Sequence, residues 1–494
     1  MVSAALEETQ IPLDEFTRMR RDNLARWPTG ADVDLDEAVA YLKALPDHKN
    51  LAKVTRRAVA EGRCLTQPRG GFATFEMHKN LLETLDKQGL ADVVPTTTDS
   101  YTRNERFAEA QRGADESEEK GRSMLNGFPV VNAGVGQCRA LTAAVNRPII
   151  ALTGTSFPRL TGEITYAGGF TGYLGSGIAY TTSYTKDTSI AEGIRNYQYL
   201  DRLVALYQEK GVELHRRQPG FLTGTNIPPC IGIAICIADT LLAAAQGVRQ
   251  YGLELGQTLH LVQDAVSIEV CNDLTQEYLK RKGYNDVFTT VTSLHWMGAW
   301  PVDRAQSFGL LVYGGFAAAV GGALSVTTKS VAEAKGIPTP EENAEGLRAA
   351  RMGIYLARGV NLRDLPEYLR EKEILETEVR VIVDKILEVG NGDVAIGTVR
   401  ALEAGLLDVP WSPNRECKSA IMPARDGDGY LRMVDSGNLP LPKRILDYHR
   451  ERLEAAANAS GKVYGPDLAI DSVYELSEDL GKLMPSMSSG LSHG

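Results

Sequence analysis

The chain has 494 residues, of which 43% are hydrophobic and 23% charged, and its formal net charge is −10. This length and composition suit a globular protein with a large core, and the negative charge argues against nucleic acid, whose backbone is met by an excess of Lys and Arg. The first residues are acidic and lack the apolar stretch of a secretory signal, so we expect a cytoplasmic chain.

Short runs rich in β-branched residues alternate with longer helical segments. We expect eight strands, in runs that begin at Leu65, Val93, Phe128, Pro148, Phe221, Leu259, Asp286 and Ala323. Eight strands that alternate with helices predict an α/β fold, a parallel (β/α)8 TIM barrel. The interval between the runs at Pro148 and Phe221 is long and predicts an insertion at the barrel mouth.

A glycine-rich stretch, TYAGGFTGYLGSGIAYTTSYTKD at residues 165–187, lies in this interval. It does not fit a dinucleotide or P-loop fingerprint, because Tyr180 stands where a third small residue is needed and no Lys-Ser/Thr pair follows. We therefore expect its glycines to allow sharp turns and close packing. Tyr180 and Tyr184 lie four residues apart, which places them on one face of a helix or one side of a strand.

Two apolar stretches, residues 227–248 and 309–326, approach the length of a membrane span. Asp239 interrupts the first and four glycines interrupt the second, so we expect buried barrel helices and no membrane segment. The six cysteines form no C-x-x-C pair and the seven histidines show no ligand spacing. This pattern predicts reduced thiols and no metal site in this chain.

The sequence predicts four parts. Residues 1–60 form a segment packed on the barrel, residues 61–340 the barrel, and residues 341–482 a mostly helical extension. Residues 483–494 form a flexible tail. Within the extension we expect long helices near residues 341–357 and 365–389.

Polar residues stand at the ends of several predicted strands, where side chains converge on the active-site face of a barrel. They are Arg69, Tyr101, Arg103, Thr153, Thr155, Thr223, Thr225, His295 and Lys329. The planar fork of arginine matches a carboxylate or phosphate, so this set predicts a small anionic substrate. Each arginine can instead pair with a structural carboxylate.

The chain resembles the catalytic epsilon (E) subunits of glutamate mutase, also called methylaspartate mutase, over nearly its whole length. The resemblance rests on collinear motifs that include QPRGG at Gln67, DSYTRNERF at Asp99, GRSMLNGFPVVNAGVGQCR at Gly121, AGGFTGYLGSGIAYTTSY at Ala167, LTGTNIPP at Leu222 and KSVAEAKGIPT at Lys329.

This resemblance implies an isomerase with a TIM barrel and adenosylcobalamin as cofactor, whose homolysis yields the radical that abstracts a substrate hydrogen. It also implies a small cobalamin-binding (sigma- or S-like) subunit and a homodimer of this chain within a heterotetramer. That subunit carries a D-x-H-x-x-G motif with the cobalt ligand. SLHWMG, residues 293–298, imitates the motif with Ser293 in place of aspartate, and we interpret it as chance.

Site roles also follow from the resemblance. Arg69 and Arg103 match arginines that grip substrate carboxylates, and Tyr180 and Tyr184 match substrate-binding tyrosines. Lys329 and Glu333 match residues near the adenosyl group, where Glu333 can bond ribose hydroxyls. Thr223 is assigned only to the pocket wall.

Three positions depart from the family pattern. Leu152 stands in place of a third arginine, Leu174 in place of a carboxylate that meets the substrate amino group, and Arg217 in place of another glutamate. Glutamate bound there would leave charges buried without partners. We therefore expect a small carboxylic acid other than glutamate as substrate. Arg217 either restores an anion site or is solvated, and we slightly favour a solvated arginine.

Three alternatives stay open. The chain can be a genuine glutamate mutase with a rearranged pocket, a non-catalytic barrel that only binds a cobalamin subunit, or a barrel lyase that needs no cobalamin. The chain keeps family residues on the substrate side of the site, Arg69 and Arg103, and on the cofactor side, Lys329 and Glu333. A barrel without catalytic activity would not need both pairs, which argues against the non-catalytic alternative.

Overall fold

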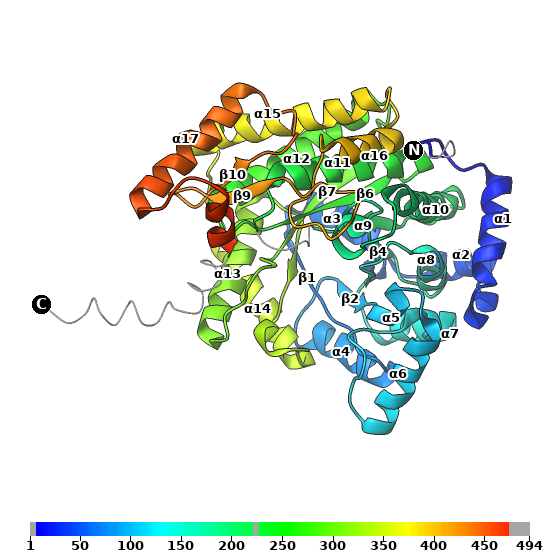
Figure 1. Cartoon of the computed structure of the whole chain (residues 1–494). Helices are drawn as coiled ribbons and strands as arrows, with labels where there is room; N and C mark the ends of the chain where they lie inside the picture. The colour runs from blue at the N-terminus through cyan, green and yellow to red at the C-terminus, as the bar shows by residue number, and fades with distance from the viewer. Residues whose placement is uncertain (1–5, 221–225, 474–494) are drawn as a thin grey trace, which may run out of the picture.

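The computed structural model of the chain describes residues 6–220 and 226–473. Eight parallel strands follow one another around a barrel in the order β1-β8-β7-β6-β5-β4-β3-β2 (Figure 1). The predicted (β/α)8 TIM barrel is confirmed. The strands are β1 (Leu65–Pro68), β2 (Val94–Thr97), β3 (Ile149–Leu152), β4 (Gly172–Leu174), β5 (His215–Arg217), β6 (Gln250–Gly256), β7 (Phe288–Leu294) and β8 (Ser325–Thr328).

The barrel is nearly closed, and two prolines interrupt the seam between β1 and β2. The N–H of Val93 donates to the Thr66 carbonyl and the N–H of Thr97 to the Gly70 carbonyl, so β2 turns its odd-numbered amides toward β1. Pro95 occupies the position between them and has no N–H. In β1 the even-numbered residues face β2, as the carbonyls of Thr66 and Gly70 show, and Pro68 is one of them and has no N–H to donate. The seam therefore has backbone bonds at its two ends and no continuous ladder.

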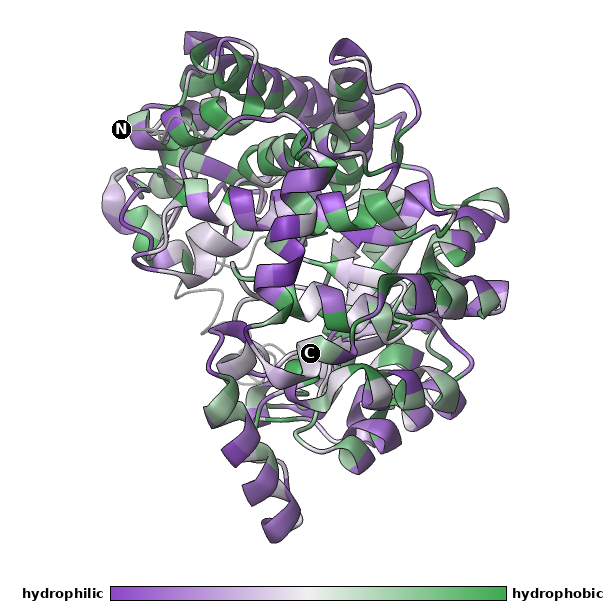
Figure 2. Cartoon of the chain, turned by 90° about the vertical axis from the view of Figure 1, so that its right-hand side faces the viewer, coloured by the Kyte–Doolittle hydropathy of each residue, from purple (hydrophilic) through white to green (hydrophobic). Residues whose placement is uncertain are grey.

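Helices cover the outside of the barrel (Figure 1). Between the strands lie α4 (Phe75–Lys87), α5 (Ser100–Arg103), α6 (Phe107–Lys120), α7 (Val130–Ala144), α8 (Arg159–Ala167), α9 (Ala179–Tyr184), α10 (Ile190–Glu209), α11 (Pro229–Gln246), α12 (Leu261–Arg281) and α13 (Arg304–Gly321), and β8 is followed by η3 (Glu333–Lys335) and α14 (Pro340–Leu356). Figure 2 shows that α6, at the bottom of the view, is largely hydrophilic, as expected for a helix that projects into solvent.

The N-terminal segment packs on the barrel helices through α1 (Leu13–Leu24), η1 (Pro28–Asp32), α2 (Leu35–Ala44), η2 (Asp47–Lys49) and α3 (Leu51–Ala60). Arg20 of α1 pairs with the buried carboxylate of Glu163 in α8 at 2.8 Å. Phe16 is fully buried on the same helix. An ion pair and an apolar contact therefore fix this segment to the barrel wall.

The C-terminal part contains α15 (Pro366–Val389), α16 (Val394–Ala404), the antiparallel pair β9 (Met422–Arg425) and β10 (Leu431–Asp435), and α17 (Lys443–Ser460). Helix α15 packs on α11 and α12 at the top of Figure 1. The long helices expected near residues 341–357 and 365–389 are confirmed as α14 and α15. The predicted part boundaries stay predictions, and the predicted tail lies outside the described residues.

Two of the expected strands are wrong. Phe128 forms only an isolated bridge with Thr98, and α7 begins two residues later. The run at Leu259 belongs to α12, whose N-cap is the side chain of His260, which accepts from the Gln263 amide. Both runs are short and apolar, and such runs suit a helix or a strand equally. The expected strand at residues 221–225 lies outside the described residues.

Three strands, β4, β5 and β6, were not expected from the sequence. Strand β4 lies inside the glycine-rich stretch, so this stretch is part of the barrel and not only an insertion. Its expected close packing is confirmed: a side chain at Gly175 would come within 2.2 Å of the Tyr197 hydroxyl of α10. Strand β5 reads His-Arg-Arg and lacks the apolar pattern of a core strand, whereas β6 alternates Tyr251, Leu253 and Leu255 with two glycines and a glutamate.

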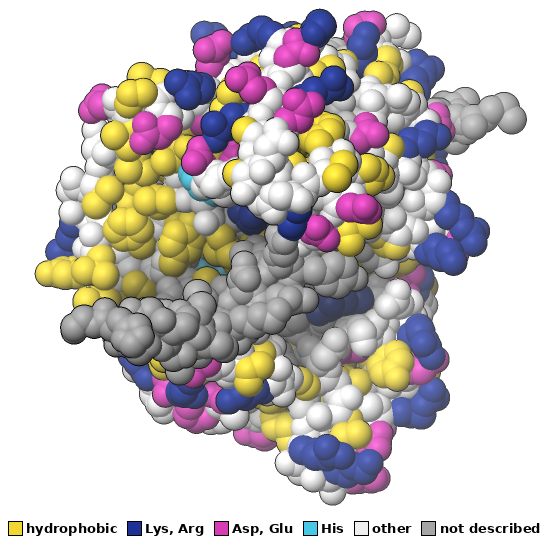
Figure 3. Space-filling model, turned by 60° about the vertical axis from the view of Figure 1, so that its left-hand side comes forward, with side chains coloured by type: hydrophobic (Ala, Val, Ile, Leu, Met, Phe, Trp, Pro, Cys, Tyr) yellow, Lys and Arg dark blue, Asp and Glu magenta, His cyan; other side chains and the backbone are white. Residues whose placement is uncertain are grey.

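Within the described residues one helix, α11, is long and apolar enough to cross a membrane, and 89% of it is buried inside the fold. Its expected role as a buried barrel helix is confirmed. Figure 3 shows Lys and Arg interspersed with Asp and Glu over the upper part of one face. All six cysteines are free, and the described residues contain no cluster of three or more potential metal ligands.

Candidate functional site

A cavity opens at the carboxyl ends of the barrel strands, the face where TIM barrels carry their sites. It leaves about 450 Å³ between protein atoms, part of it open to solvent. Six of the residues expected at the site line it. The lining comprises Arg69, Thr97, Arg103, Leu152, Gly154, Leu174, Tyr180, Tyr184, Pro219, Glu254, Leu294 and Thr327.

Arg69 and Arg103 supply the positive charge of this cavity. Arg69 follows β1, and its Nη1 donates to the Met297 sulfur at 3.5 Å. Arg103 ends α5, and its Nε donates to the Thr98 carbonyl at 2.7 Å. Neither guanidinium forms an ion pair with a carboxylate of the described residues, and these two bonds go to a sulfur and a carbonyl. Burial lowers the pKa of Arg103, and the charge of Arg69 adds to this effect. Two unpaired guanidinium groups in one cavity form a site for an acid.

Gly154 makes room for Arg103. Its φ is +55°, in the left-handed region that favours glycine, and a side chain there would lie 3.3 Å from Nη1 of Arg103. The residue is the second after the end of β3, so the turn after this strand lies against the guanidinium.

Tyr180 and Tyr184 face the cavity from α9, which confirms that they share one helix face. Their ring centroids are 5.5 Å apart. Tyr180 is buried, whereas Tyr184 is 47% exposed and lies at the rim. Burial raises the pKa of Tyr180 well above its usual value, so its hydroxyl stays protonated.

Leu152, Leu174 and Arg217 form one row across three neighbouring strands. Leu152 pairs in register with Leu174, and Leu174 with Arg217. The two leucines line the cavity and are 8% and 5% exposed. They give one wall of the cavity an apolar surface.

Arg217 is 3% exposed and points into the barrel, so the preference for a solvated arginine is wrong. Its Nη2 donates to Oε1 of Gln67 in β1 at 2.8 Å. The same nitrogen lies 3.6 Å from Oε2 of Glu254 in β6. Arg217 thus lies beside the cavity and not among the residues that line it.

Glu254 is the carboxylate that the sequence-based site missed. It is 3% exposed and lines the cavity. One oxygen accepts from the Gly220 amide and the other from the Thr327 hydroxyl, each at 2.8 Å. The signal was the alternation of β6, QYGLELG, which places Glu254 on the same side as Gly252, but this strand was not expected.

Lys329 and Glu333 lie next to the cavity, after β8. Lys329 Nζ is 3.8 Å from Glu333 Oε2 and 4.8 Å from the centroid of the Trp300 ring. Burial lowers the pKa of Lys329 to about 8; Glu333 opposes this effect and Arg69 adds to it. The Glu333 side chain is 23% exposed, and its Oε1 accepts from the Ser330 amide. This carboxylate can therefore accept bonds from a bound group. Thr223 lies outside the described residues.

His295 is fully buried after β7. Its Nδ1 accepts from the Lys329 amide, and its Nε2 faces Gly314, where an added side chain would come within 2.3 Å. Burial lowers its pKa to about 3. Both ring nitrogens are thus enclosed, which agrees with SLHWMG being a chance match.

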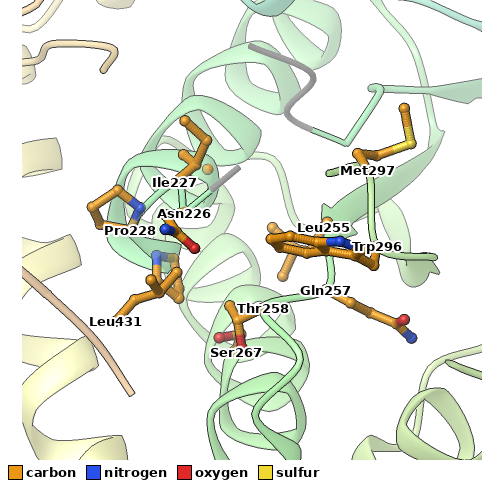
Figure 4. Close-up of a pocket in the computed structure, with 13 residues that line it drawn as sticks. Asn226, Ile227, Pro228, Leu255, Gln257, Thr258, Ser267, Trp296, Met297 and Leu431 are labelled. Carbon is orange, nitrogen blue, oxygen red and sulfur yellow. The ribbon is translucent and has the colours of Figure 1, made fainter. Parts of the chain in front are cut away.

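A second cavity, of about 540 Å³ and also partly open to solvent, is lined by Met297, whose sulfur contacts Arg69 of the first cavity (Figure 4). The ring of Trp296 faces Asn226 and Pro228 across it, while the Gln257 amide points away and donates to the Gly314 carbonyl. No charged side chain of the described residues lines this cavity. The cavity of Arg69 and Arg103 is therefore the better site for an acid.

The family model of the methylaspartate mutase E chain matches residues 45–484. The chain is 44% identical to the glutamate mutase epsilon subunit of Desulfitobacterium hafniense over 94% of this chain and 96% of the relative. It is 42% identical to that of Treponema denticola over 95% and 96%, and 39% identical to that of Haloarcula marismortui over 95% and 95%. The chain therefore belongs to the methylaspartate mutase E chain family and is an isomerase of that family.

Proposed function

We propose that the chain is the catalytic subunit of an adenosylcobalamin-dependent carbon-skeleton mutase whose substrate is a small carboxylic acid other than glutamate. Arg69 and Arg103 bind a carboxylate of this acid, and Tyr180 and Tyr184 close over it. Leu152 and Leu174 face an apolar or differently substituted part of the same molecule. The barrel holds the substrate, and a partner subunit that caps its mouth excludes water from the reacting carbon.

The observation that carries this proposal is the lining of the cavity. It contains two guanidinium groups without carboxylate partners, two leucines, and one carboxylate, Glu254, whose neighbours already donate to it. The ammonium of glutamate would find no free carboxylate among the described residues of this lining. Burial of an unpaired charge costs several kcal/mol, about the free energy that separates a good substrate from a poor one.

Adenosylcobalamin fits the residues beside the cavity. Glu333 keeps a partly exposed carboxylate for ribose hydroxyls, and Lys329 holds it in place. When bound, this cofactor supplies the abstraction of a substrate hydrogen. The described residues offer no exposed histidine after β7, since His295 is enclosed. The cobalt ligand then comes from a partner.

That partner is a small cobalamin-binding subunit of the sigma or S type, and this chain forms a homodimer within a heterotetramer in the cytoplasm. The printed name of the relatives, epsilon subunit, supports an enzyme of more than one kind of chain.

Two of the three alternatives still compete with this proposal, because membership of an isomerase family argues against a barrel lyase. A genuine glutamate mutase would need the ammonium to bind Glu254 in spite of Arg217. A non-catalytic barrel would not need both a pair of residues for the substrate, Arg69 and Arg103, and a pair for the cofactor. The cofactor pair is Lys329 and Glu333. Turnover distinguishes all three.

The test is co-purification with candidate cobalamin-binding subunits, followed by a screen of small carboxylic acids with adenosylcobalamin and detection of isomers by mass spectrometry. Isomerisation of an acid other than glutamate supports the proposal. Isomerisation of glutamate alone favours the first alternative, and cobalamin-subunit binding without turnover of any acid favours the second.

A further inference from the structure

Arg217 crosses the interior of the barrel from β5. Its Nη2 reaches Gln67 on β1 at 2.8 Å, and its Nη1 lies 3.4 Å from the Thr292 hydroxyl on β7. Its Nε is buried and has no hydrogen-bond partner among the described residues. Neutral groups therefore satisfy only part of the guanidinium, and within the described part of the chain its one ion pair is with Glu254.

Gly252 provides the space for this side chain. It pairs in register with Arg217, and a side-chain carbon at this position would lie 2.9 Å from Cγ and 3.1 Å from Cδ of the arginine. The barrel thus has a gap on β6 at the place where the arginine stem passes. The absence of a side chain at Gly252 therefore matches the presence of an arginine at position 217.

The pairing with Arg217 changes what Glu254 can do. The carboxylate is 3% exposed, and its two oxygens accept from Gly220 and Thr327 while Arg217 balances its charge. A substrate ammonium would have to share this carboxylate with a guanidinium 3.6 Å away. Two cations at one buried carboxylate repel each other, so the site disfavours an ammonium.

The remaining charges leave the cavity with an excess of two positive groups. Arg69 and Arg103 line it without carboxylate partners, and Lys329 is matched by Glu333. Asp99 does not line the cavity and forms no ion pair with Arg103 among the described residues, although its charge raises the pKa of Arg103 from a distance. Burial raises the pKa of Asp99 itself, and its Oδ1 accepts from the amides of Tyr101 and Thr102. A ligand with two negative charges and no positive charge balances Arg69 and Arg103. Glutamate carries two carboxylates and one ammonium and leaves one positive charge unbalanced.

We propose that the substrate is a dicarboxylic acid without an amino group, and that Arg217 is the residue that sets this specificity by neutralising Glu254. This inference rests on the proposed function for the reaction, but it concerns which acid binds. Arg217 acts through Glu254 and is a positioning residue.

Isothermal titration of the full-length chain with three five-carbon acids tests the charge preference. Glutarate has two carboxylates, (S)-glutamate adds an ammonium, and pentanoate keeps one carboxylate. Glutarate is expected to bind with a Kd in the millimolar range or tighter, and at least about tenfold tighter than the other two. No binding of glutarate in that range, or equal or tighter binding of glutamate, would overturn the proposal. Tightest binding of pentanoate would assign the site to a monocarboxylic acid instead.

Variants test the role of Arg217. Arg217→Gln frees Glu254 and is expected to shift the ratio of the two Kd values toward glutamate by about tenfold. Arg217→Lys keeps the charge and should preserve the preference for glutarate. The double variant Arg217→Gln with Glu254→Gln should lose the shift, because no carboxylate remains for the ammonium. An unchanged ratio in a folded Arg217→Gln variant contradicts the role.

If Arg217→Gln does not fold, the comparison of the three acids on the unmodified chain still decides the charge preference, and Arg217→Lys still tests the need for a cation. The titrations need neither cobalamin nor a partner subunit. A preference for glutamate would thus refute the substrate class, here and in the proposed function alike, and would leave the mutase activity untouched. Absence of turnover with a competent partner would refute the mutase activity and leave the binding preference untouched.

Discussion

Leu152, the last residue of β3, stands in register beside Leu174, the last residue of β4, and both side chains line the cavity that contains Arg69 and Arg103. The apolar wall of the site therefore comes from two neighbouring strand ends and not from a mobile loop. Because strand ends are held by the backbone ladder, the position of this wall is fixed by the fold.

The two arginines should act on substrate capture. Arg69→Lys and Arg103→Lys each keep a charge but lose the planar fork, so the Kd of the bound acid should rise about tenfold to a hundredfold. Arg106→Lys is the matched control, since Arg106 pairs with Glu109 on the surface and should change nothing. Titration calorimetry measures the effect. Unchanged affinity in both site variants would show that the acid binds elsewhere.

Glu333 should act on turnover instead. Glu333→Gln removes the charge that Lys329 and the ribose hydroxyls meet, so the turnover number should fall about tenfold or more while the affinity for the acid stays within about twofold. Steady-state kinetics with the partner subunit and direct titration of the acid separate the two quantities. A loss of acid affinity equal to that of Arg69→Lys would mean that our division of the site is wrong.

The affinity for the acid should depend on Lys329. Burial lowers the pKa of this lysine to about 8, so it carries its charge below pH 8 and loses it as the pH rises through that value. The Kd of an anionic acid is expected to rise about threefold between pH 7 and pH 9. Lys329→Arg keeps the charge over this range and should flatten the profile.

The lowered pKa of Lys329 also determines how the free energy of unfolding depends on pH. Between about pH 8 and pH 10.5 the unfolded chain binds more protons at Lys329 than the folded chain, so this group makes the free energy of unfolding rise with pH there. In Lys329→Met this contribution should disappear. An identical slope in both proteins would contradict the pKa assigned to Lys329.

Gly252 should tolerate no side chain. Gly252→Ala places a carbon 2.9 Å from both Cγ of Arg217 and Nε2 of His215, so the free energy of unfolding should fall by about 1–3 kcal/mol. The control is Gly232→Ala in α11, where the nearest atom would lie at an ordinary 3.5 Å and the substitution should be neutral or stabilising by up to about 1 kcal/mol. Urea denaturation compares them. Equal stability of the two variants would show that Arg217 has room to move.

The barrel was predictable because five of its strands, β1, β2, β3, β7 and β8, fall in runs of apolar or β-branched residues. Strand β5 was not, because two arginines in a row read as a surface segment. Their burial depends on partners distant in sequence: Arg216 pairs with Asp201 of α10, and Arg217 with Glu254 of β6. The residue pattern of a single segment cannot predict ion pairs with residues that are distant in the sequence.

The residues of the candidate site were predictable where they lie in a motif that resembles the family. Arg69, Arg103, Tyr180 and Tyr184 do line one cavity, and Leu152 and Leu174 join them. Glu254 was missed because its strand was missed, and the inward direction of Arg217 could not be decided without the register of β5 against β6.

The chain alone should not bind cobalamin tightly, because both ring nitrogens of His295 are enclosed by Lys329 and Gly314. Ultraviolet–visible titration with and without the small subunit should show a base-on spectrum only when that subunit is present. Tight stoichiometric binding by this chain alone, lost in His295→Ala, would overturn the assignment to two subunits.

The central claim is that the substrate is not glutamate, and the rate of conversion of (S)-glutamate to 3-methylaspartate tests it most directly. With a competent small subunit and adenosylcobalamin, the unmodified chain should convert glutamate poorly or not at all, since an ammonium and a carboxylate would be left against Leu152 and Leu174. The double variant Leu152→Arg with Leu174→Glu should raise the rate above that of either single variant, because each new buried charge needs the other. Efficient conversion by the unmodified chain would contradict the account and leave a genuine glutamate mutase with an unusual pocket.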